Sequence, residues 1–161
     1  MNTNQLTSFT GTGLGALTAL DLRVNLIDTF TATGMNSLFA LYLDNNKLTA
    51  LPPTLLTLPA LIYLNISVNL IAKVPDTITT KTTWSTLYSN YNCLRRASLG
   101  TAKSAWFDTY NDGDPWTNLN PACPAPSICA SVTDVPEEEC NALMDIYDTT
   151  GGNTWTTKTG W

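Results

Sequence analysis

The chain has 161 residues, which is enough for one domain with an attached segment. It carries 8 basic and 13 acidic residues, and the resulting formal net charge of −5 argues against a nucleic-acid partner, which needs clustered Lys and Arg. Histidine is absent, which removes the commonest general base and metal ligand. There is also no phosphate-binding loop and no apolar run of membrane-spanning length. We therefore expect no enzyme, no cofactor, no metal site and no membrane insertion.

A spaced pattern of apolar residues and asparagine recurs through the first part of the chain. Its clearest copy is Leu38-x-x-Leu41-x-Leu43-x-x-Asn46-x-Leu48. The asparagines at the equivalent positions are Asn4, Asn25, Asn46, Asn69 and Asn92. They are 21, 21, 23 and 23 residues apart. A regular period of this length indicates repeated units that bury their apolar faces against one another.

This spacing resembles that of leucine-rich-repeat proteins, over roughly residues 4–96. The resemblance implies an α/β fold: a right-handed leucine-rich-repeat solenoid with a short parallel sheet on the concave face, few helices and a mostly irregular convex side. Strands are expected at about 19–24, 40–45, 63–68 and 86–91. Because successive side chains of a strand point to opposite faces, the leucines should face the core and the residues between them should face out.

The four complete copies place an asparagine where the chain leaves each expected strand. We expect a structural ladder in which each amide bonds backbone groups of its own turn and of the adjacent turn. Its members are Asn25, Asn46, Asn69 and Asn92. The segments that lead back to the next strand contain either Gly or Pro, and they are expected to be extended or single-turn backbone.

The period stops after Leu94, and a short helix is predicted over about 101–110, ending at Asn111-Asp112-Gly113. The residues here resemble the C-terminal cap of secreted bacterial-type leucine-rich-repeat proteins. The residues that carry this resemblance are Asn92-Cys93-Leu94, Trp106-Phe107-Asp108, Trp116 and Cys123. An end cap is expected because the last repeat would otherwise expose its core.

The final segment begins a helix after Pro136, and Gly151-Gly152 ends it. Its pattern of Ala-Leu, Tyr, Thr-Gly-Gly and two Trp resembles the N-terminal cap that precedes a leucine-rich-repeat array. We therefore expect this chain to be a piece of a longer tandem protein, and the chain itself to have four parts. These parts are the repeats at 1–96, the C-terminal cap at 97–122, a Cys/Pro linker at 123–135 and the N-terminal-cap-like segment at 136–161.

Four cysteines, which allow three pairings, lie in and after the cap. We favour Cys93–Cys123, which would tie the cap to the last repeat, and Cys129–Cys140, which would pin the linker to the next helix. A zinc site is disfavoured because there is no Cys-x-x-Cys unit and no His. Free thiols stay open for a cytosolic protein, whereas disulfides would indicate an exported one.

Polar and aromatic residues occupy the outward positions of the expected concave sheet. The candidate ligand-binding residues are Asp21, Arg23, Tyr42, Asp44, Tyr63, Asn65, Tyr88, Asn90 and Tyr91. Tyrosine is enriched where binding energy concentrates, although it also suits strands for structural reasons. Two further motifs are weaker. The acidic stretch 108–114 lacks the ligands that a calcium loop needs at its third and twelfth positions, and Asn65-Ile66-Ser67 matches a glycosylation acceptor.

The predicted function is a non-catalytic protein- or glycan-binding or adhesion module of a larger leucine-rich-repeat protein, secreted or at the cell surface, that binds through the concave face. The alternative is a structural building block that assembles head to tail into a surface layer or filament. In that case the segment 137–161 of one copy would cover the open first repeat of another copy, a contact that propagates.

Overall fold

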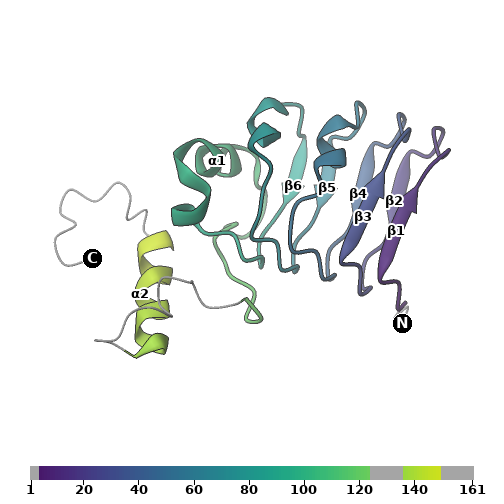
Figure 1. Ribbon diagram of the computed structural model, residues 1–161. Coiled ribbons are helices and arrows are strands. Elements are labelled where there is room, and N and C mark those ends of the chain that lie inside the picture. Colours follow the sequence, from purple (N-terminus) through teal and green to yellow (C-terminus); the bar gives the residue numbers. More distant parts are fainter. Residues whose placement is uncertain (1–3, 124–135, 150–161) are drawn as a thin grey trace.

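The structure is a computed structural model that describes residues 4–123 and 136–149. Its larger sheet has four parallel strands in the order β2-β4-β5-β6 (Figure 1). These strands are β2 (Ala19–Asp21), β4 (Ala40–Tyr42), β5 (Tyr63–Asn65) and β6 (Thr86–Tyr88). Each begins where a strand is predicted but is shorter, because the chain soon turns through a residue with positive φ. The four turning residues are Val24, Asn45, Val68 and Tyr91.

In the first repeated units, the segments that lead from one strand of the larger sheet back to the next form a second, two-stranded sheet. β1 (Ser8–Gly11) pairs in parallel with β3 (Thr29–Ala32). Both segments combine threonine or serine with phenylalanine, and β-branched and aromatic side chains favour extended backbone. The rings of Phe9 and Phe30 stack with their centroids 5.4 Å apart. Side chains as well as backbone therefore join these two segments.

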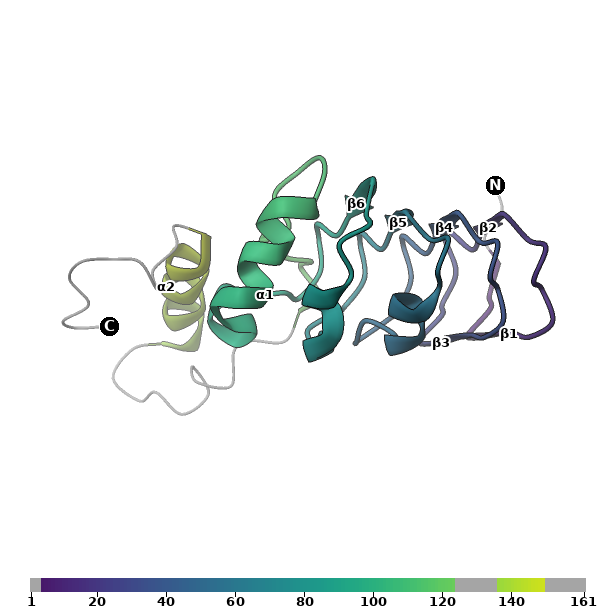
Figure 2. The ribbon, with the colours of Figure 1, turned by 90° about the horizontal axis from the view of Figure 1, so that it is seen from above.

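The two later units return through short 3-10 helices instead of strands (Figure 2). These are η1 (Pro53–Thr57), which follows Pro52, and η2 (Asp76–Thr80), which follows Pro75. Proline has no N–H to donate to a ladder of backbone hydrogen bonds, so the strand pairing of the earlier units does not continue here.

The prediction of a right-handed leucine-rich-repeat solenoid with one short sheet and a mostly irregular opposite side is wrong. The structure is an α/β fold with two small parallel sheets, of four and two strands, and two α-helices within the described residues. The difference has a local cause. The segments 8–11 and 29–32, expected to be extended or single-turn backbone without a strand partner, have the composition of strands and pair with each other.

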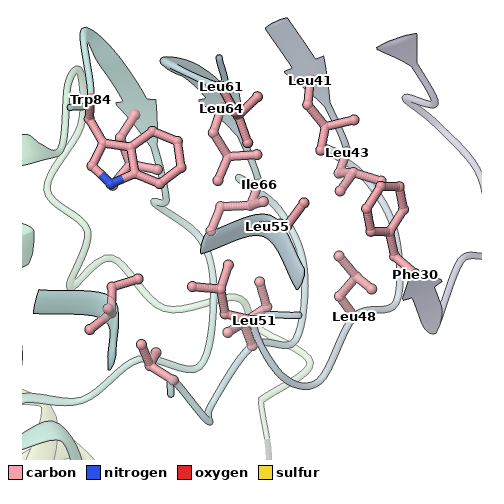
Figure 3. Close-up of a cluster of buried hydrophobic side chains, with 14 of the residues drawn as sticks. Phe30, Leu41, Leu43, Leu48, Leu51, Leu55, Leu61, Leu64, Ile66 and Trp84 are labelled. Atoms are coloured by element: carbon pink, nitrogen blue, oxygen red, sulfur yellow. The ribbon is translucent and has the colours of Figure 1, made fainter. Parts of the chain in front are cut away.

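The core is built from the leucine positions of the repeated pattern (Figure 3). Leu41, Leu64 and Leu87 are in register along the sheet and are at most 1% exposed. Leu55 of η1 and Ile78 of η2 are buried in the same cluster. Burying one such side chain stabilises the fold by about 1.5–3 kcal/mol. Since this one cluster holds residues from all the repeated units, each unit packs against the next.

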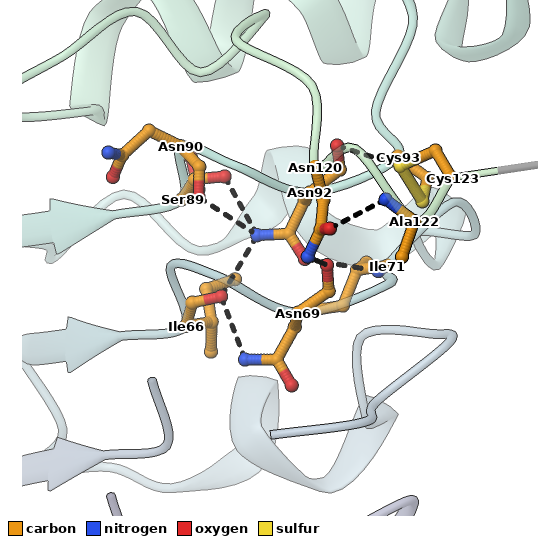
Figure 4. Close-up of a disulfide and its surroundings, with 10 residues drawn as sticks. All are labelled: Ile66, Asn69, Ile71, Ser89, Asn90, Asn92, Cys93, Asn120, Ala122 and Cys123. Atoms are coloured by element: carbon orange, nitrogen blue, oxygen red, sulfur yellow. Dashed lines mark hydrogen bonds between the residues drawn. A yellow bond between two sulfur atoms is a disulfide. The ribbon is translucent and has the colours of Figure 1, made fainter. Parts of the chain in front are cut away.

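A ladder of buried asparagine side chains joins successive units. Its members are Asn25, Asn46, Asn69 and Asn92. In each of them Oδ1 accepts the backbone N–H of a residue in the preceding unit, and Nδ2 donates to backbone carbonyls. For Asn92 the donor is the N–H of Ile71 at 3.0 Å, and the acceptors include the carbonyls of Ile66 and Ser89, both at 2.9 Å (Figure 4).

Helix α1 (Arg96–Tyr110) covers the β6 end of the stacked repeated units (Figure 2). It begins before the predicted helix of 101–110, and Gly100, with φ of 76°, marks a kink between its two parts. Its residues Trp106 and Phe107 are buried in the core cluster. Within the described residues, no helix is long and apolar enough to cross a membrane.

An ion pair and a ring fasten the end of α1. Asp108 accepts two hydrogen bonds from the Arg96 guanidinium, at 2.8 and 2.5 Å, and a third from the indole N–H of Trp116 at 2.8 Å. The guanidinium carbon of Arg96 lies 4.9 Å from the centroid of the Trp116 ring. Asp108 is thus occupied as a structural acceptor, which argues against the calcium loop considered for 108–114.

The predicted Cys93–Cys123 disulfide is confirmed, and it joins the last repeated unit to the end of the cap (Figure 4). The other predicted pairing, Cys129–Cys140, involves Cys129, which lies outside the described residues. The predicted linker lies outside them too, apart from Cys123. Of the last segment, the structure describes 136–149, where α2 (Glu137–Thr149) contacts α1.

Candidate binding surface

The outward side of the four-stranded sheet gathers the polar and aromatic residues that the sequence predicts as a site. In the register of the strands, Asp21, Tyr42, Asn65 and Tyr88 form one row, and Tyr63 lies two residues before Asn65 on the same side. We call this surface the tyrosine face. It consists of Asp21, Arg23, Tyr42, Asp44, Tyr63, Asn65, Tyr88 and Asn90.

Three tyrosine rings from three adjacent strands form a continuous row on this face. The centroids of Tyr42 and Tyr63 are 4.9 Å apart, with their planes tilted by 46°. Those of Tyr63 and Tyr88 are 6.1 Å apart, in an edge-to-face arrangement at 62°. All three side chains are half-buried. Such aromatic pairs contribute about 0.5–1.5 kcal/mol beyond their area burial, so the rings hold one another in place.

An arginine extends the row of rings at the β2 edge. The guanidinium carbon of Arg23 lies 5.2 Å from the centroid of the Tyr42 ring. Arg23 also donates to both carboxylate oxygens of Asp21, with the shortest distance 2.6 Å. These hydrogen bonds lower the pKa of Asp21. Both charged side chains are about half exposed, so solvent screens the pair and its contribution to stability is small.

Asp44 is the buried charge of the face, with only 9% of its surface exposed. Its Oδ2 accepts a hydrogen bond from the side-chain amide of Asn45 at 3.1 Å, whereas Oδ1 is buried with no hydrogen-bond partner among the described residues. Burial raises the pKa of Asp44, because desolvation disfavours the ionised carboxylate. A buried, incompletely paired carboxylate costs stability, so packing alone does not account for this residue.

Burial also raises the pKa of the Tyr63 hydroxyl, and the neighbouring Tyr42, Tyr88 and Asp44 add to this effect. A phenol with a raised pKa stays neutral across the physiological range. The Tyr63 hydroxyl at the centre of the tyrosine face is therefore uncharged at neutral pH.

Asn65 is held in place by a local turn. Its Oδ1 accepts hydrogen bonds from the backbone N–H of Ser67 at 3.0 Å and from the Ser67 hydroxyl at 2.7 Å. The side chain is half-buried between the tyrosine-bearing strands. This fixed position makes Asn65 a rigid polar neighbour of the rings and an awkward glycosylation acceptor.

The two remaining predicted residues lie at the end of β6. Asn90 is half-buried, and its carbonyl accepts the N–H of Val68 at 3.0 Å. Tyr91 has a φ of 54° and is 38% exposed. Within the described residues it makes no ring contact with the other tyrosines, so the structure separates Tyr91 from the row formed by Tyr42, Tyr63 and Tyr88.

Sequence reasoning missed the residues that close the face beside β6. Asp112 donates its backbone N–H to the carbonyl of Leu87 at 2.6 Å, and its Oδ2 accepts the N–H of Leu87 at 3.2 Å. The adjoining Gly113 lies so close to the Tyr88 ring that a Cβ there would approach Cε1 to 3.2 Å. The sequence marks this turn only as a helix end, and nothing in it indicates a return to β6.

The surface around these residues is open. A cleft of about 340 Å³ at its β2 edge is lined by Asn4, Asp21, Arg23 and Val24. Across the described parts of the chain, no group of three or more Cys, Asp or Glu side chains is placed to hold a metal ion.

The chain matches no family model and no curated protein. The resemblance of its repeats to leucine-rich-repeat proteins therefore stays a prediction.

Proposed function

We propose that this chain is a non-catalytic binding module whose tyrosine face holds a protein or glycan ligand. The observation that carries the proposal is the continuous row of Tyr42, Tyr63 and Tyr88 on three hydrogen-bonded strands. Tyrosine offers a large contact area with little conformational freedom to lose. The sheet holds these rings in place before any ligand arrives, which lowers the entropic cost of binding.

The proposed location is the cell surface or the extracellular space, as part of a larger leucine-rich-repeat protein. The Cys93–Cys123 disulfide supports an oxidising compartment, because cytosolic proteins rarely keep structural disulfides. The period of 21 to 23 residues and the asparagine ladder support the family.

The test is the double variant Tyr42→Ala and Tyr88→Ala, compared with the wild-type chain on arrays of glycans and extracellular proteins. We expect the variant to lose the ligands that the wild type retains, while its circular dichroism spectrum is unchanged. Tyr91→Ala is the matched control, because it removes a more exposed tyrosine outside the ring row. If the double variant retains every ligand of the wild type, the tyrosine face is not the binding surface.

A second candidate function is self-association through the first repeated units. β2 pairs only with β4, so its other edge has no strand partner within the described residues. Leu6, Leu14 and Leu26 in these units are 39–46% exposed. An open edge beside exposed apolar side chains favours assembly with another chain. Sedimentation velocity over a hundredfold concentration range tests this, and a monomer throughout would rule it out.

A further inference from the structure

Negative charge predominates on and beside the tyrosine face. The face contains the carboxylates of Asp21 and Asp44, and Asp112 lies beside the face at β6. The one cationic side chain of the face is Arg23, and this guanidinium is already engaged by Asp21. The face is therefore acidic and aromatic at once, with its only positive charge confined to the β2 edge.

One ring of the row already lies beside a cation, the guanidinium of Arg23. Its guanidinium carbon lies 5.2 Å from the Tyr42 centroid, which is a cation–π distance. Within the described residues, no Lys or Arg lies over the ring of Tyr63 or of Tyr88. Among the described parts of the chain, the rings of Tyr63 and Tyr88 thus have no cation beside them, although they belong to the same row as Tyr42.

The buried carboxylate strengthens the attraction for a cation. Asp44 Oδ1 lies below the surface without a hydrogen-bond donor. Because this oxygen is covered, Asp44 acts through its electric field and not by direct contact with a ligand. Partial burial lowers the effective dielectric constant, so this field is less screened than that of a surface carboxylate.

We infer that the tyrosine face binds a cationic polypeptide segment, with arginine side chains placed over Tyr63 and Tyr88. This inference rests on the proposed function and specifies the chemistry of its ligand. The spacing favours a polypeptide, since alternate side chains of an extended peptide are about 6.6 Å apart, close to the 6.1 Å between these two rings. Arginine suits the rings better than lysine because its planar guanidinium stacks on aromatic faces.

The experiment is a nuclear magnetic resonance titration of the ¹⁵N-labelled chain with the peptide acetyl-Gly-Arg-Gly-Arg-Gly-amide. The peptide acetyl-Gly-Gln-Gly-Gln-Gly-amide and neutral maltohexaose are titrated in parallel. We expect the arginine peptide to shift the backbone amide signals of 63–65 and 86–88, and the glutamine peptide to leave them in place. Raising the ionic strength from low to high salt should weaken the interaction.

Two pairs of variants separate the rings and the charge from general effects. Tyr63→Leu keeps an apolar side chain but removes the ring, and it should weaken binding of the arginine peptide by about fivefold. Its control is Tyr91→Leu, which should leave binding unchanged. Asp44→Asn should also weaken binding by about fivefold. Its control, Asp28→Asn, removes the same charge from an exposed carboxylate next to β3 of the other sheet.

The outcomes distinguish this inference from the proposed function. Equal affinity for both peptides, or equal losses in Asp44→Asn and Asp28→Asn, would overturn the cationic ligand. If maltohexaose binds in a manner that requires Tyr42 and Tyr88 while the arginine peptide does not bind, the proposed function stands and the inference fails. If the double alanine variant binds all probes like the wild type, both fail.

Discussion

Asn69 Oδ1 accepts the backbone N–H of Leu48 at 3.0 Å, across 21 residues of sequence. The Nδ2 of the same amide donates to the carbonyl of Leu43 at 2.9 Å, so one side chain satisfies two backbone groups of the preceding unit. Asn69 is fully buried. Water therefore cannot replace these partners without entering the core, and the tyrosine-bearing strands depend on this amide for their spacing.

We expect Asn69→Ala to lower the free energy of unfolding by about 2–4 kcal/mol, because each buried group left unpaired costs about 1–3 kcal/mol. Equilibrium unfolding in urea, followed by circular dichroism, measures this loss. The control is Asn118→Ala, since the side chain of Asn118 makes no hydrogen bond within the described residues. It should change stability by less than about 0.5 kcal/mol. Similar losses in both variants would refute the role of the ladder.

Val68 has a φ of 53°, a conformation that β-branched residues rarely adopt. Asparagine tolerates this left-handed region, and Asn45 occupies it at the equivalent position. Val68→Asn should therefore raise the free energy of unfolding by about 1 kcal/mol. Val68→Thr is the matched control, because it adds a polar atom but keeps the branched Cβ. Urea unfolding in which both variants gain equally would show that backbone strain is not the cause.

The Cys93–Cys123 disulfide closes a loop with a sequence separation of 30. In the chain-entropy account, opening a loop of this length costs about 3–4 kcal/mol. The double variant Cys93→Ala and Cys123→Ala should lose this amount in thermal unfolding. A reducing agent should destabilise the wild type strongly. If the reducing agent lowers the stability of the double variant further, this additional loss would indicate the predicted Cys129–Cys140 disulfide.

The sequence predicts the start of each strand in the larger sheet, because this follows from the spacing of the repeated pattern. The Cys93–Cys123 pair is one of three possible pairings and is favoured because it would tie the cap to the last repeated unit. The sequence overestimates strand length, since three of the four residues at the turning position are of types that rarely adopt a positive φ. Val24, Val68 and Tyr91 adopt it despite their side chains. The β1–β3 sheet is not predictable in the same way. Its two segments have the composition of strands, but they are 21 residues apart, and they pair only because the packing of successive units brings them side by side.

The tyrosine face is predictable from alternation alone, because Tyr42, Tyr63 and Tyr88 all fall on outward positions of strands that are in register. Two properties of this face cannot be predicted from the sequence. The burial of Asp44 depends on how neighbouring side chains pack above it, and the return of Asp112 to β6 depends on the geometry of α1. Such tertiary effects leave no periodic signal in the sequence.

Asp44 and Asp108 should give opposite pH dependence of stability. Burial raises the pKa of Asp44 in the folded state, whereas hydrogen bonds from Arg96 lower the pKa of Asp108. A raised pKa means that the folded chain binds the proton more tightly than the unfolded one. The stability associated with Asp44 is thus present below the unfolded pKa, near 3.8, and is lost as pH rises through the folded pKa.

Asp44→Asn, which removes the ionisable group, should therefore be more stable than the wild type at pH 7, and this gain should disappear below the unfolded pKa. For Asp108 the sign is reversed, because its contribution is present above the unfolded pKa and is lost as pH falls through the folded pKa. Asp108→Asn should be less stable than the wild type at pH 7, and the two should converge in acid. Urea unfolding at pH 7 and at pH 3 measures both differences. A destabilised Asp44→Asn at pH 7 would mean that the buried carboxylate is adequately paired, and this result would also remove the field invoked for cation binding.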